Sequence, residues 1–215
     1  MNGLDDTMTS VRTQQQRVEE SSQRLMSAAI TLIAERGYSQ TTAKDIGLRA
    51  GYSRAMVAER FGDKDALLDA LLVDYYEEQI RVDESFGASG LQVLFSPVNR
   101  LIELVESDPT MARAMLVLNF EAAHDTGLLR ERISMHLSTF SLRLLRAAEA
   151  GQIDGSIRKD IDPTETASEV MATGIGLAYG WIVLPGDADF ADTLRKWRDR
   201  VVSSIGTSSK PAGGA

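Results

Sequence analysis

The chain has 215 residues, 43% of them hydrophobic, with a formal net charge of −8 and no cysteine. This length and apolar content suffice for one large domain or two small ones, and the lack of cysteine excludes disulfides, zinc–thiolate sites and thiol nucleophiles. The longest apolar run, residues 174–184, is too short for the roughly 20 residues of a membrane-spanning helix. Because the polar, acidic start shows no secretory signal, the sequence predicts a globular protein of the cytoplasm.

The clearest local pattern is a pair of short helices around one glycine. The hydroxyl of Thr42 can cap the free amides of the first helix, and Asp45, three residues later, can return the contact as in a capping box. Gly51 ends this helix, because glycine tolerates the left-handed backbone of a sharp turn. Ser53 can then cap a second helix, which we expect from about residue 54 to residue 61.

The second helix would bury Val57 and Phe61, which stand one turn apart. Its other side then remains available to face a DNA groove or its phosphates. That side carries Arg54, Ala55, Met56, Ala58 and Arg60. The pattern predicts a helix-turn-helix that binds DNA.

Local charge supports the same interpretation. Residues 36–64 carry six basic and three acidic side chains, so this segment has a net charge of +3 while the rest of the chain sums to −11. Such a polarised chain would present one end to a polyanion. Charge alone would favour the simpler alternative of solvated charges on an ordinary helical bundle. Combined with the capped helix-Gly-helix geometry, it favours DNA binding.

The remainder of the chain is also predicted to be helical. An apolar stripe marks a helix from residue 64 to about residue 82, long enough to connect the DNA-binding part to a second domain. A break is expected at residues 86–90. Further helices are expected over residues 97–107, 109–123 and 126–150, followed by a loop at 151–159.

The last two helices carry a strong packing signal. Asp162 and the proline after it mark the start of a helix that reaches about residue 184 and contains many small residues, which would let another helix approach closely. The final helix repeats apolar residues on one face. We therefore predict a dimer surface here, the alternative being that both stripes are internal core. The predicted interface residues are Val170, Gly174, Leu177, Phe190, Leu194, Trp197 and Val201.

Several short motifs occur in the order and spacing of a known family. An amphipathic helix ends in ERGY (35–38), and TTAKDI (41–46), RAGYS (49–53) and RFGDKDALL (60–68) follow. Through these motifs, residues 17–72 resemble the TetR (tetracycline-repressor-like) transcriptional regulators. The ordered set makes the resemblance specific, whereas a lone helix-turn-helix pattern would be weak.

The resemblance implies DNA contacts by Thr42, Lys44, Ser53, Arg54, Ala55, Met56, Arg60 and Lys64. Phosphates would be held by Thr42 and Lys44 on one side and by Arg60 and Lys64 on the other. The groove-entering end of the second helix would carry Ser53, Arg54 and Ala55. Arg54 would read a guanine edge through two hydrogen bonds, or contact a phosphate instead. Met56 would contact a thymine methyl, or fill the gap between helices.

The resemblance also implies a homodimer formed through the last two helices and an unidentified small-molecule effector bound among the middle helices. The candidate pocket residues are Leu104, Met111, Met115, Leu118, Phe120, His124, Phe140 and Trp181. The alternative is that these residues are ordinary core. No cofactor and no metal is expected, because His124 and His136 stand far apart in sequence without a compact carboxylate cluster.

These elements divide the chain into four parts. We expect a flexible arm at residues 1–16, a helix-turn-helix domain at 17–63, a helical ligand-binding and dimerisation domain at 64–202, and a disordered tail at 203–215. Ser, Gly and Ala dominate the tail.

Taken together, the sequence predicts an all-α repressor that occupies a palindromic operator as a dimer and responds to a ligand, with activation left open. The alternative is a helical small-molecule-binding protein or enzyme without operator binding. Family members often have Thr and Tyr where Met56 and Ala58 stand, and Ala where Gly47 stands. The missing Thr and Tyr and the acidic charge of the rest of the chain support this alternative. No nucleophile motif, phosphate loop or metal-ligand spacing supports an enzyme.

Overall fold

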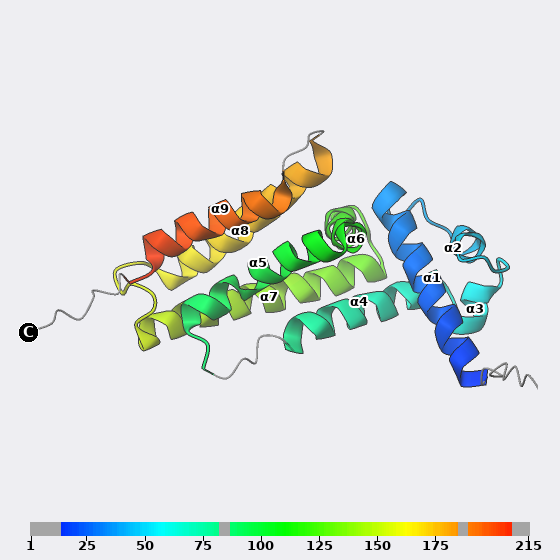
Figure 1. Ribbon diagram of the computed structural model, residues 1–215, viewed down its shortest axis with the longest axis horizontal. Helices are drawn as coiled ribbons and strands as arrows, with labels where there is room; N and C mark the ends of the chain where they lie inside the picture. The colour runs from blue at the N-terminus through cyan, green and yellow to red at the C-terminus, as the bar shows by residue number, and fades with distance from the viewer. Residues whose placement is uncertain (1–13, 82–86, 185–188, 208–215) are drawn as a thin grey trace, which may run out of the picture.

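The computed structural model describes residues 14–81, 87–184 and 189–207, which fold almost entirely into helices (Figure 1). In chain order they are α1 (Gln14–Arg36), α2 (Ala43–Arg49), α3 (Met56–Phe61), α4 (Lys64–Arg81), α5 (Gly90–Ser107), α6 (Pro109–Glu121), α7 (Leu128–Asp154), α8 (Pro163–Val183) and α9 (Phe190–Ile205). The predicted all-α class is confirmed. Within these ranges, no helix is long and apolar enough to cross a lipid bilayer.

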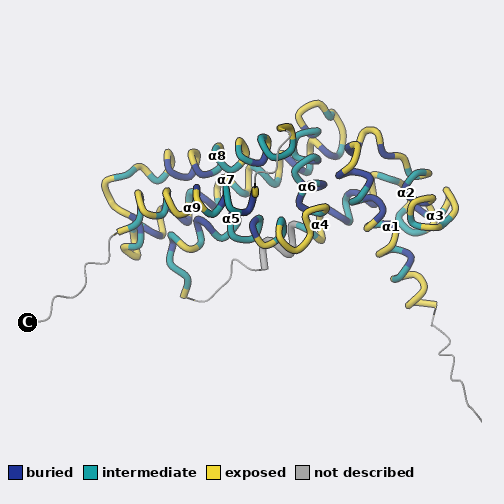
Figure 2. Tube along the Cα trace, turned by 45° about the horizontal axis from the view of Figure 1, so that its top comes forward, coloured by how far each residue is buried: buried dark blue, intermediate teal, exposed yellow. Residues whose placement is uncertain are grey.

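Helices α1 to α3 form a head at one end of an elongated molecule, and the later helices form its body (Figure 1). Helix α4 runs from the head along the body, and α6 packs against α1. Within the body, α5 packs against α7 and α9, and α7 packs against α8. Exposed residues gather around α2 and α3 at the outer end of the head (Figure 2). The head therefore meets the body chiefly through α4 and α6.

The predicted helix starts at Thr42 and Asp162 are confirmed. The Thr42 hydroxyl accepts the Asp45 amide at 3.2 Å, and the Asp45 carboxylate accepts the Thr42 amide at 3.3 Å, so the capping box is complete. Asp162 accepts two amides of the first turn of α8, at 2.7 and 3.1 Å. Each of these contacts spans at most three residues, which is why the sequence alone reveals them.

The predicted start of the second short helix is wrong. Helix α3 begins at Met56 rather than at residue 54, and its N-cap is Ala55, whose side chain makes no capping bond. Ser53 takes part through its backbone instead, because its carbonyl accepts the Met56 amide at 3.1 Å. Residues 54 and 55 form one more turn between the glycine turn and the start of α3.

The predicted start of the next body helix at Pro97 is also wrong. Helix α5 begins at Gly90, where Ser89 forms a capping box with Gln92. Pro97 lies inside the helix and has no amide to donate. The carbonyl of Val93, four residues earlier, instead accepts the Ser96 hydroxyl at 3.0 Å.

Three other predicted boundaries differ from those of the structure. Helix α7 continues past residue 150 to Asp154 and ends at Gly155, which has a φ of +81°. Helix α9 continues to Ile205, past the predicted start of the tail at residue 203. Helix α1 begins at Gln14, inside the predicted arm. The remainder of the predicted arm, residues 1–13, and of the tail, residues 208–215, lies outside the described residues, as do Val82 and Phe86.

Two clusters of buried apolar residues hold the molecule together. The first joins the head residues of α1 to α3 with α4, α6 and the start of α7, and so includes both Val57 and Leu118. The second joins α5, the end of α7, α8 and α9. The first cluster therefore crosses the domain boundary predicted at residues 63–64, because the head buries its inner face against α4 and α6.

Candidate nucleic-acid interface and internal cavity

The helix-turn-helix has the compact geometry that its sequence predicts. Gly51 has a φ of +80° and makes the turn between α2 and α3. Ile46 of α2 and Val57 of α3 are both buried in the hydrophobic core of the head. Gly47 is buried as well, and a Cβ at this position would lie 2.5 Å from the Ser53 carbonyl oxygen. The close approach of the turn explains why glycine stands at this position.

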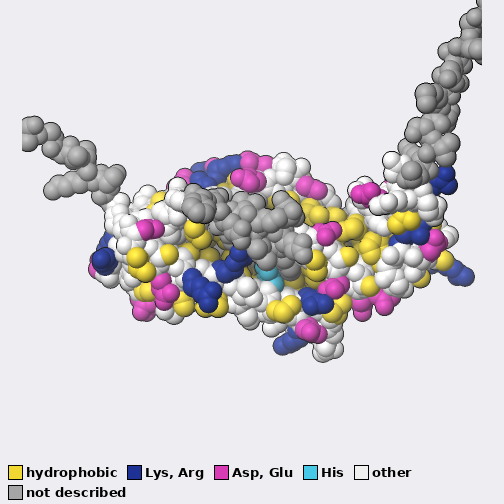
Figure 3. Space-filling view, turned by 90° about the horizontal axis from the view of Figure 1, so that it is seen from below, with side chains coloured by type: hydrophobic (Ala, Val, Ile, Leu, Met, Phe, Trp, Pro, Cys, Tyr) yellow, Lys and Arg dark blue, Asp and Glu magenta, His cyan; other side chains and the backbone are white. Residues whose placement is uncertain are grey.

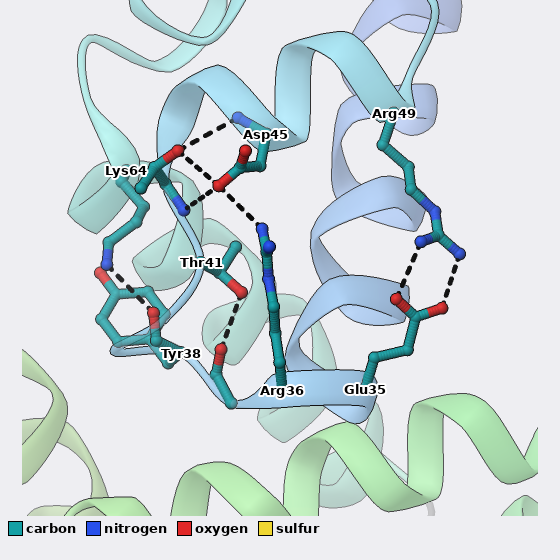
Figure 4. A network of polar contacts seen from close by, with 9 residues as sticks. Glu35, Arg36, Tyr38, Thr41, Asp45, Arg49 and Lys64 are labelled. Atoms are coloured by element: carbon teal, nitrogen blue, oxygen red, sulfur yellow. Dashed lines mark hydrogen bonds and ion pairs between the residues drawn. The ribbon is translucent and has the colours of Figure 1, made fainter.

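Two arginines of the head form ion pairs between α1 and α2 (Figure 4). The Arg36 guanidinium lies 2.8 Å from the Asp45 carboxylate, and Arg49 lies 2.7 Å from Glu35. The hydrogen bonds from the Thr42 hydroxyl and amide, followed by the Arg36 charge, hold the pKa of Asp45 below its usual value. These arginines fix α2 on α1, so part of the local positive charge is already neutralised within the head.

Arg60 and Lys64 are also held by neighbours. Arg60 donates to the Ser21 hydroxyl at 2.7 Å and pairs with Glu59 at 2.8 Å, and its side chain is only 17% exposed. The Lys64 ammonium lies 3.7 Å from the centre of the Tyr38 ring and donates to the Tyr38 carbonyl at 3.2 Å (Figure 4). Partial burial lowers the pKa of Lys64. Both residues lie beside the predicted interface, with much of their hydrogen-bonding capacity used inside the protein.

Lys44 and Arg54 differ from these four. Both side chains are exposed, and neither makes an ion pair with any residue that the structure describes. Thr42, Ser53 and Ala55 are exposed around them, whereas Met56 is half-buried and packs against the head core. The structure thus brings all eight predicted DNA-contacting residues to one end of the molecule. Among the basic residues of this set, Lys44 and Arg54 are the two that are exposed, whereas Arg60 and Lys64 are half-buried.

The body contains a partly open cavity of about 230 Å³, which is lined by α4 and the five helices that follow. Its walls are largely apolar, and the polar side chains that line it are Tyr75, Arg100, Asn119, His136 and Arg143. His136 stacks on Phe140 with 6.1 Å between ring centres. Burial, and then the nearby Arg143 charge, lowers the pKa of His136 to about 4. Its imidazole is therefore neutral at pH 7.

Two of the eight predicted pocket residues, Phe120 and Phe140, line this cavity. Met115 and Leu118 are instead buried in the cluster shared with the head, and Met111 packs against that cluster. The other three, which do not line the cavity either, are Leu104, His124 and Trp181. Trp181 stacks on the Phe190 ring, with 4.7 Å between the centres.

Helix α6 explains this division, because it has two apolar faces. Leu116 and Phe120 face the cavity, while Met115 and Leu118 face the head. Helical periodicity reveals an apolar face and does not say what packs against it. The cavity residues His136 and Arg143 were missed, although they share a helix face with Phe140 at the spacing of one to two turns, which is the signal that could have found them.

The predicted dimer residues differ in burial within the single chain. Val170, Phe190, Leu194 and Trp197 are buried in the core of the single chain, and the edge-to-face contact of Trp197 with Phe95, 6.2 Å between ring centres, shows that this face of α9 packs on α5. Leu177 and Val201 pack against the same core, and Gly174 faces the Trp197 ring.

The exposed apolar residues of α8 form a face that adjoins the cavity, because Ile175 also lines the cavity and the Tyr179 ring meets the Phe120 ring edge-to-face, with 5.3 Å between ring centres. We call this face the α8 stripe; it consists of Ala172, Ile175, Gly176, Tyr179 and Val183. Ile175, Tyr179 and Val183 are 40%, 53% and 52% exposed.

On the face of the molecule in Figure 3, acidic, basic and hydrophobic side chains are intermixed.

Comparisons with known proteins agree with this architecture. The family model described as "Bacterial regulatory proteins, tetR family" matches residues 25–71. The HTH-type transcriptional repressor KstR2 of Rhodococcus jostii (strain RHA1) is 29% identical over 176 residues, which cover 80% of this chain and 84% of that protein.

Solved structures show the same fold. A TetR-family transcriptional regulator from Agrobacterium tumefaciens matches 88% of this chain and 100% of its own, with a TM-score of 0.74 and 19% identity. The structure of AibR in complex with isovaleryl coenzyme A and operator DNA matches 86% of this chain and 98% of its own, with a TM-score of 0.64 and 20% identity. Together with the capped helix-turn-helix, these similarities show that residues 25–71 form a DNA-binding domain of the tetR family of bacterial regulatory proteins, and that the whole chain has the fold of such regulators.

Proposed function

We propose that this DNA-binding regulator is a repressor that occupies a palindromic operator as a homodimer and releases it when a small molecule fills the body cavity. The observation that carries the proposal is the outer end of the head, where Arg54 is exposed just before α3 and Lys44 is exposed in the first turn of α2. Arg54 would read a base edge from there, and Lys44 would neutralise a phosphate. Its setting would be the cytoplasm, where the operator is.

The homodimer rests on the α8 stripe. An exposed apolar face on one helix of a chain with a packed core favours a contact with another chain. A twofold axis through this stripe would pair it with itself and would present two heads to two half-sites of an operator.

Helix α6 connects the cavity to the head and supports a ligand response. Leu116 and Phe120 line the cavity, and the same helix ends at Glu121, whose carboxylate accepts the Tyr38 amide at 2.6 Å and the Ser39 hydroxyl at 2.9 Å. A ligand that displaces α6 would therefore also displace the junction between α1 and α2. A coupling of about 1–3 kcal/mol would change operator affinity roughly 5–150-fold. AibR, with the same fold, was solved with a coenzyme A thioester and operator DNA together.

The first test is selection of bound duplexes from a random pool by the purified protein, followed by affinity for the enriched duplex at two salt concentrations. An inverted repeat with steep salt dependence supports the proposal. A folded protein that enriches no sequence would support the alternative of a helical small-molecule-binding protein without operator binding.

Two variants separate the roles of the cations. Lys44→Ala should weaken binding to all duplexes and lower the salt slope by about 1.8, which is about 0.9 for each of the two Lys44 side chains of the dimer. Lys159→Ala, an exposed lysine of the body, should leave the slope unchanged. Arg54→Ala should cost about 1–3 kcal/mol on the enriched duplex and much less on random DNA. Equal losses on both duplexes for Arg54→Ala would assign Arg54 to a phosphate.

A further inference from the structure

The cavity and the α8 stripe share a wall at Ile175. This residue lines the cavity, and its side chain is also 40% exposed at the surface of α8. Among the cavity-lining residues in the described part of the chain, it is the only one that is exposed. A side chain that meets both the cavity and the solvent makes the wall one side chain thick at this point. Whatever packs on Ile175 from outside therefore also bears on the cavity.

An aromatic pair extends the shared wall by one helical turn. Tyr179 is 53% exposed on the α8 stripe, and its ring meets the Phe120 ring edge-to-face with 5.3 Å between the centres. Phe120 lines the cavity from α6. Aromatic pairs of this kind prefer a defined mutual geometry, so the position of Tyr179 is tied to that of a cavity-lining ring.

A second copy of the chain suits the α8 stripe better than a charged partner does. Helix α8 lies at the outer edge of the body, with exposed residues along it (Figure 2). The five residues of the stripe carry no charge, whereas the whole chain has a formal net charge of −8. Two copies with the same net charge repel each other, and an uncharged apolar face is where they can approach most closely. Ala172 and Gly176 also leave room for the larger side chains of a copy related by a twofold axis.

We propose that a second copy of the chain, packed on the α8 stripe, completes the cavity wall at Ile175 and Tyr179, so that filling the cavity and forming the dimer strengthen each other. This inference rests on the proposed function, from which it takes the dimer and the ligand, and it adds how the two are linked. A ligand that strengthens the dimer releases the operator by displacing the heads, not by separating the two chains.

The coupling has a physical cause in the thinness of the wall. In a monomer without ligand, Ile175 has solvent on one side and the cavity on the other, so few contacts fix its position. A ligand supplies contacts from inside, and a second chain supplies them from outside. Whichever binds second meets a wall that is already ordered and loses less conformational entropy.

The test measures the coupling in both directions on the full chain without DNA. The probe is N-phenyl-1-naphthylamine, a neutral apolar fluorophore. Sedimentation gives the dimer dissociation constant with and without saturating probe, and fluorescence titration below and above that constant gives the probe affinities of monomer and dimer. We expect the dimer to bind the probe at least about fivefold more tightly than the monomer. Because a dimer holds two probes, saturating probe should then lower the dimer dissociation constant by about 25-fold or more.

Four outcomes would overturn the proposal. They are a protein that stays monomeric with and without probe, absence of probe binding, equal probe affinity of monomer and dimer, and a dimer dissociation constant that rises with probe. The last outcome would place the probe on the α8 stripe, in competition with the second chain.

Two variants of the stripe locate the shared wall. Ile175→Ala and Val183→Ala each shorten an exposed apolar side chain of the stripe, but only Ile175 lines the cavity. Both should weaken the dimer. The ratio of dimer to monomer probe affinity should stay at about fivefold or more in Val183→Ala and fall below about twofold in Ile175→Ala. Equal ratios in the two folded variants would contradict the shared wall. Circular dichroism establishes folding, and the measurements on the unaltered protein decide if a variant does not fold.

This result is separable from the proposed function. A dimer that enriches an inverted repeat but binds the probe as tightly as its monomer does would remain an operator-binding protein with an independent cavity. A protein that shows the coupling but enriches no duplex would retain the shared wall and lose the proposed operator function.

Discussion

His136 illustrates how burial changes the chemistry of one residue. Burial and the nearby Arg143 lower its pKa to about 4 in the folded protein, whereas an unfolded chain has a histidine pKa of about 6.5. Above pH 6.5 both states are neutral at this site, so the folded state has its full stability. As the pH falls from about 6.5 to about 4, the unfolded chain binds a proton that the folded protein does not, and stability is lost.

We therefore predict that His136→Gln reduces the acid sensitivity of folding. Between pH 7 and pH 4.5, urea unfolding should show that the unaltered protein loses roughly 2–3 kcal/mol more than the variant. His124→Gln, at an exposed position, is the control and should behave like the unaltered protein. Equal losses for the unaltered protein and His136→Gln would mean that His136 takes up its proton without penalty.

At the level of elements, the crossing of α5 and α7 depends on two glycines. A methyl group at Gly90 would overlap the backbone of Gly151, and the Asp154 carboxylate accepts the Gly90 amide at 2.6 Å. A clash with backbone atoms cannot be relieved by a change of side-chain rotamer. The contact therefore sets both the spacing of the helices and the level at which cavity residues face each other.

Gly90→Ala should lower the free energy of unfolding by about 3 kcal/mol or more, because the added methyl forces the two helices apart. Gly180→Ala on α8 is the matched control, since its nearest neighbour would be 4.0 Å away. It should raise stability by about 0.5–1 kcal/mol through helix propensity. Urea unfolding of both variants measures the difference, and equal stability would show that α5 and α7 can separate without cost.

For the whole molecule, the dimer prediction now rests on the α8 stripe. Val183→Glu places a charge on this stripe, and in a twofold contact each glutamate would be buried near its partner's copy. We expect the variant to be monomeric at micromolar concentration by sedimentation and to bind the operator more weakly. Ile153→Glu, on a side chain that is 86% exposed at the end of α7, should remain dimeric. A dimeric Val183→Glu protein would place the interface elsewhere.

The sequence by itself determined the features whose hydrogen bonds close within a few residues. The Thr42–Asp45 capping box, the turn at Gly51 and the cap at Asp162 are all present where the sequence predicted them. The helical class and the helix-turn-helix follow from these signals, because caps, glycine turns and periodicity act within one or two helical turns.

Only the tertiary structure decided what each helix face meets. The apolar face of α9 with Leu194 and Trp197 packs on the core of its own chain, Met115 faces the head while Phe120 faces the cavity, and Lys64 lies over Tyr38. An apolar or basic residue looks the same in sequence whether it meets core, cavity or another chain. Its partner is distant in sequence, so burial and pairing are fixed only when the helices assemble.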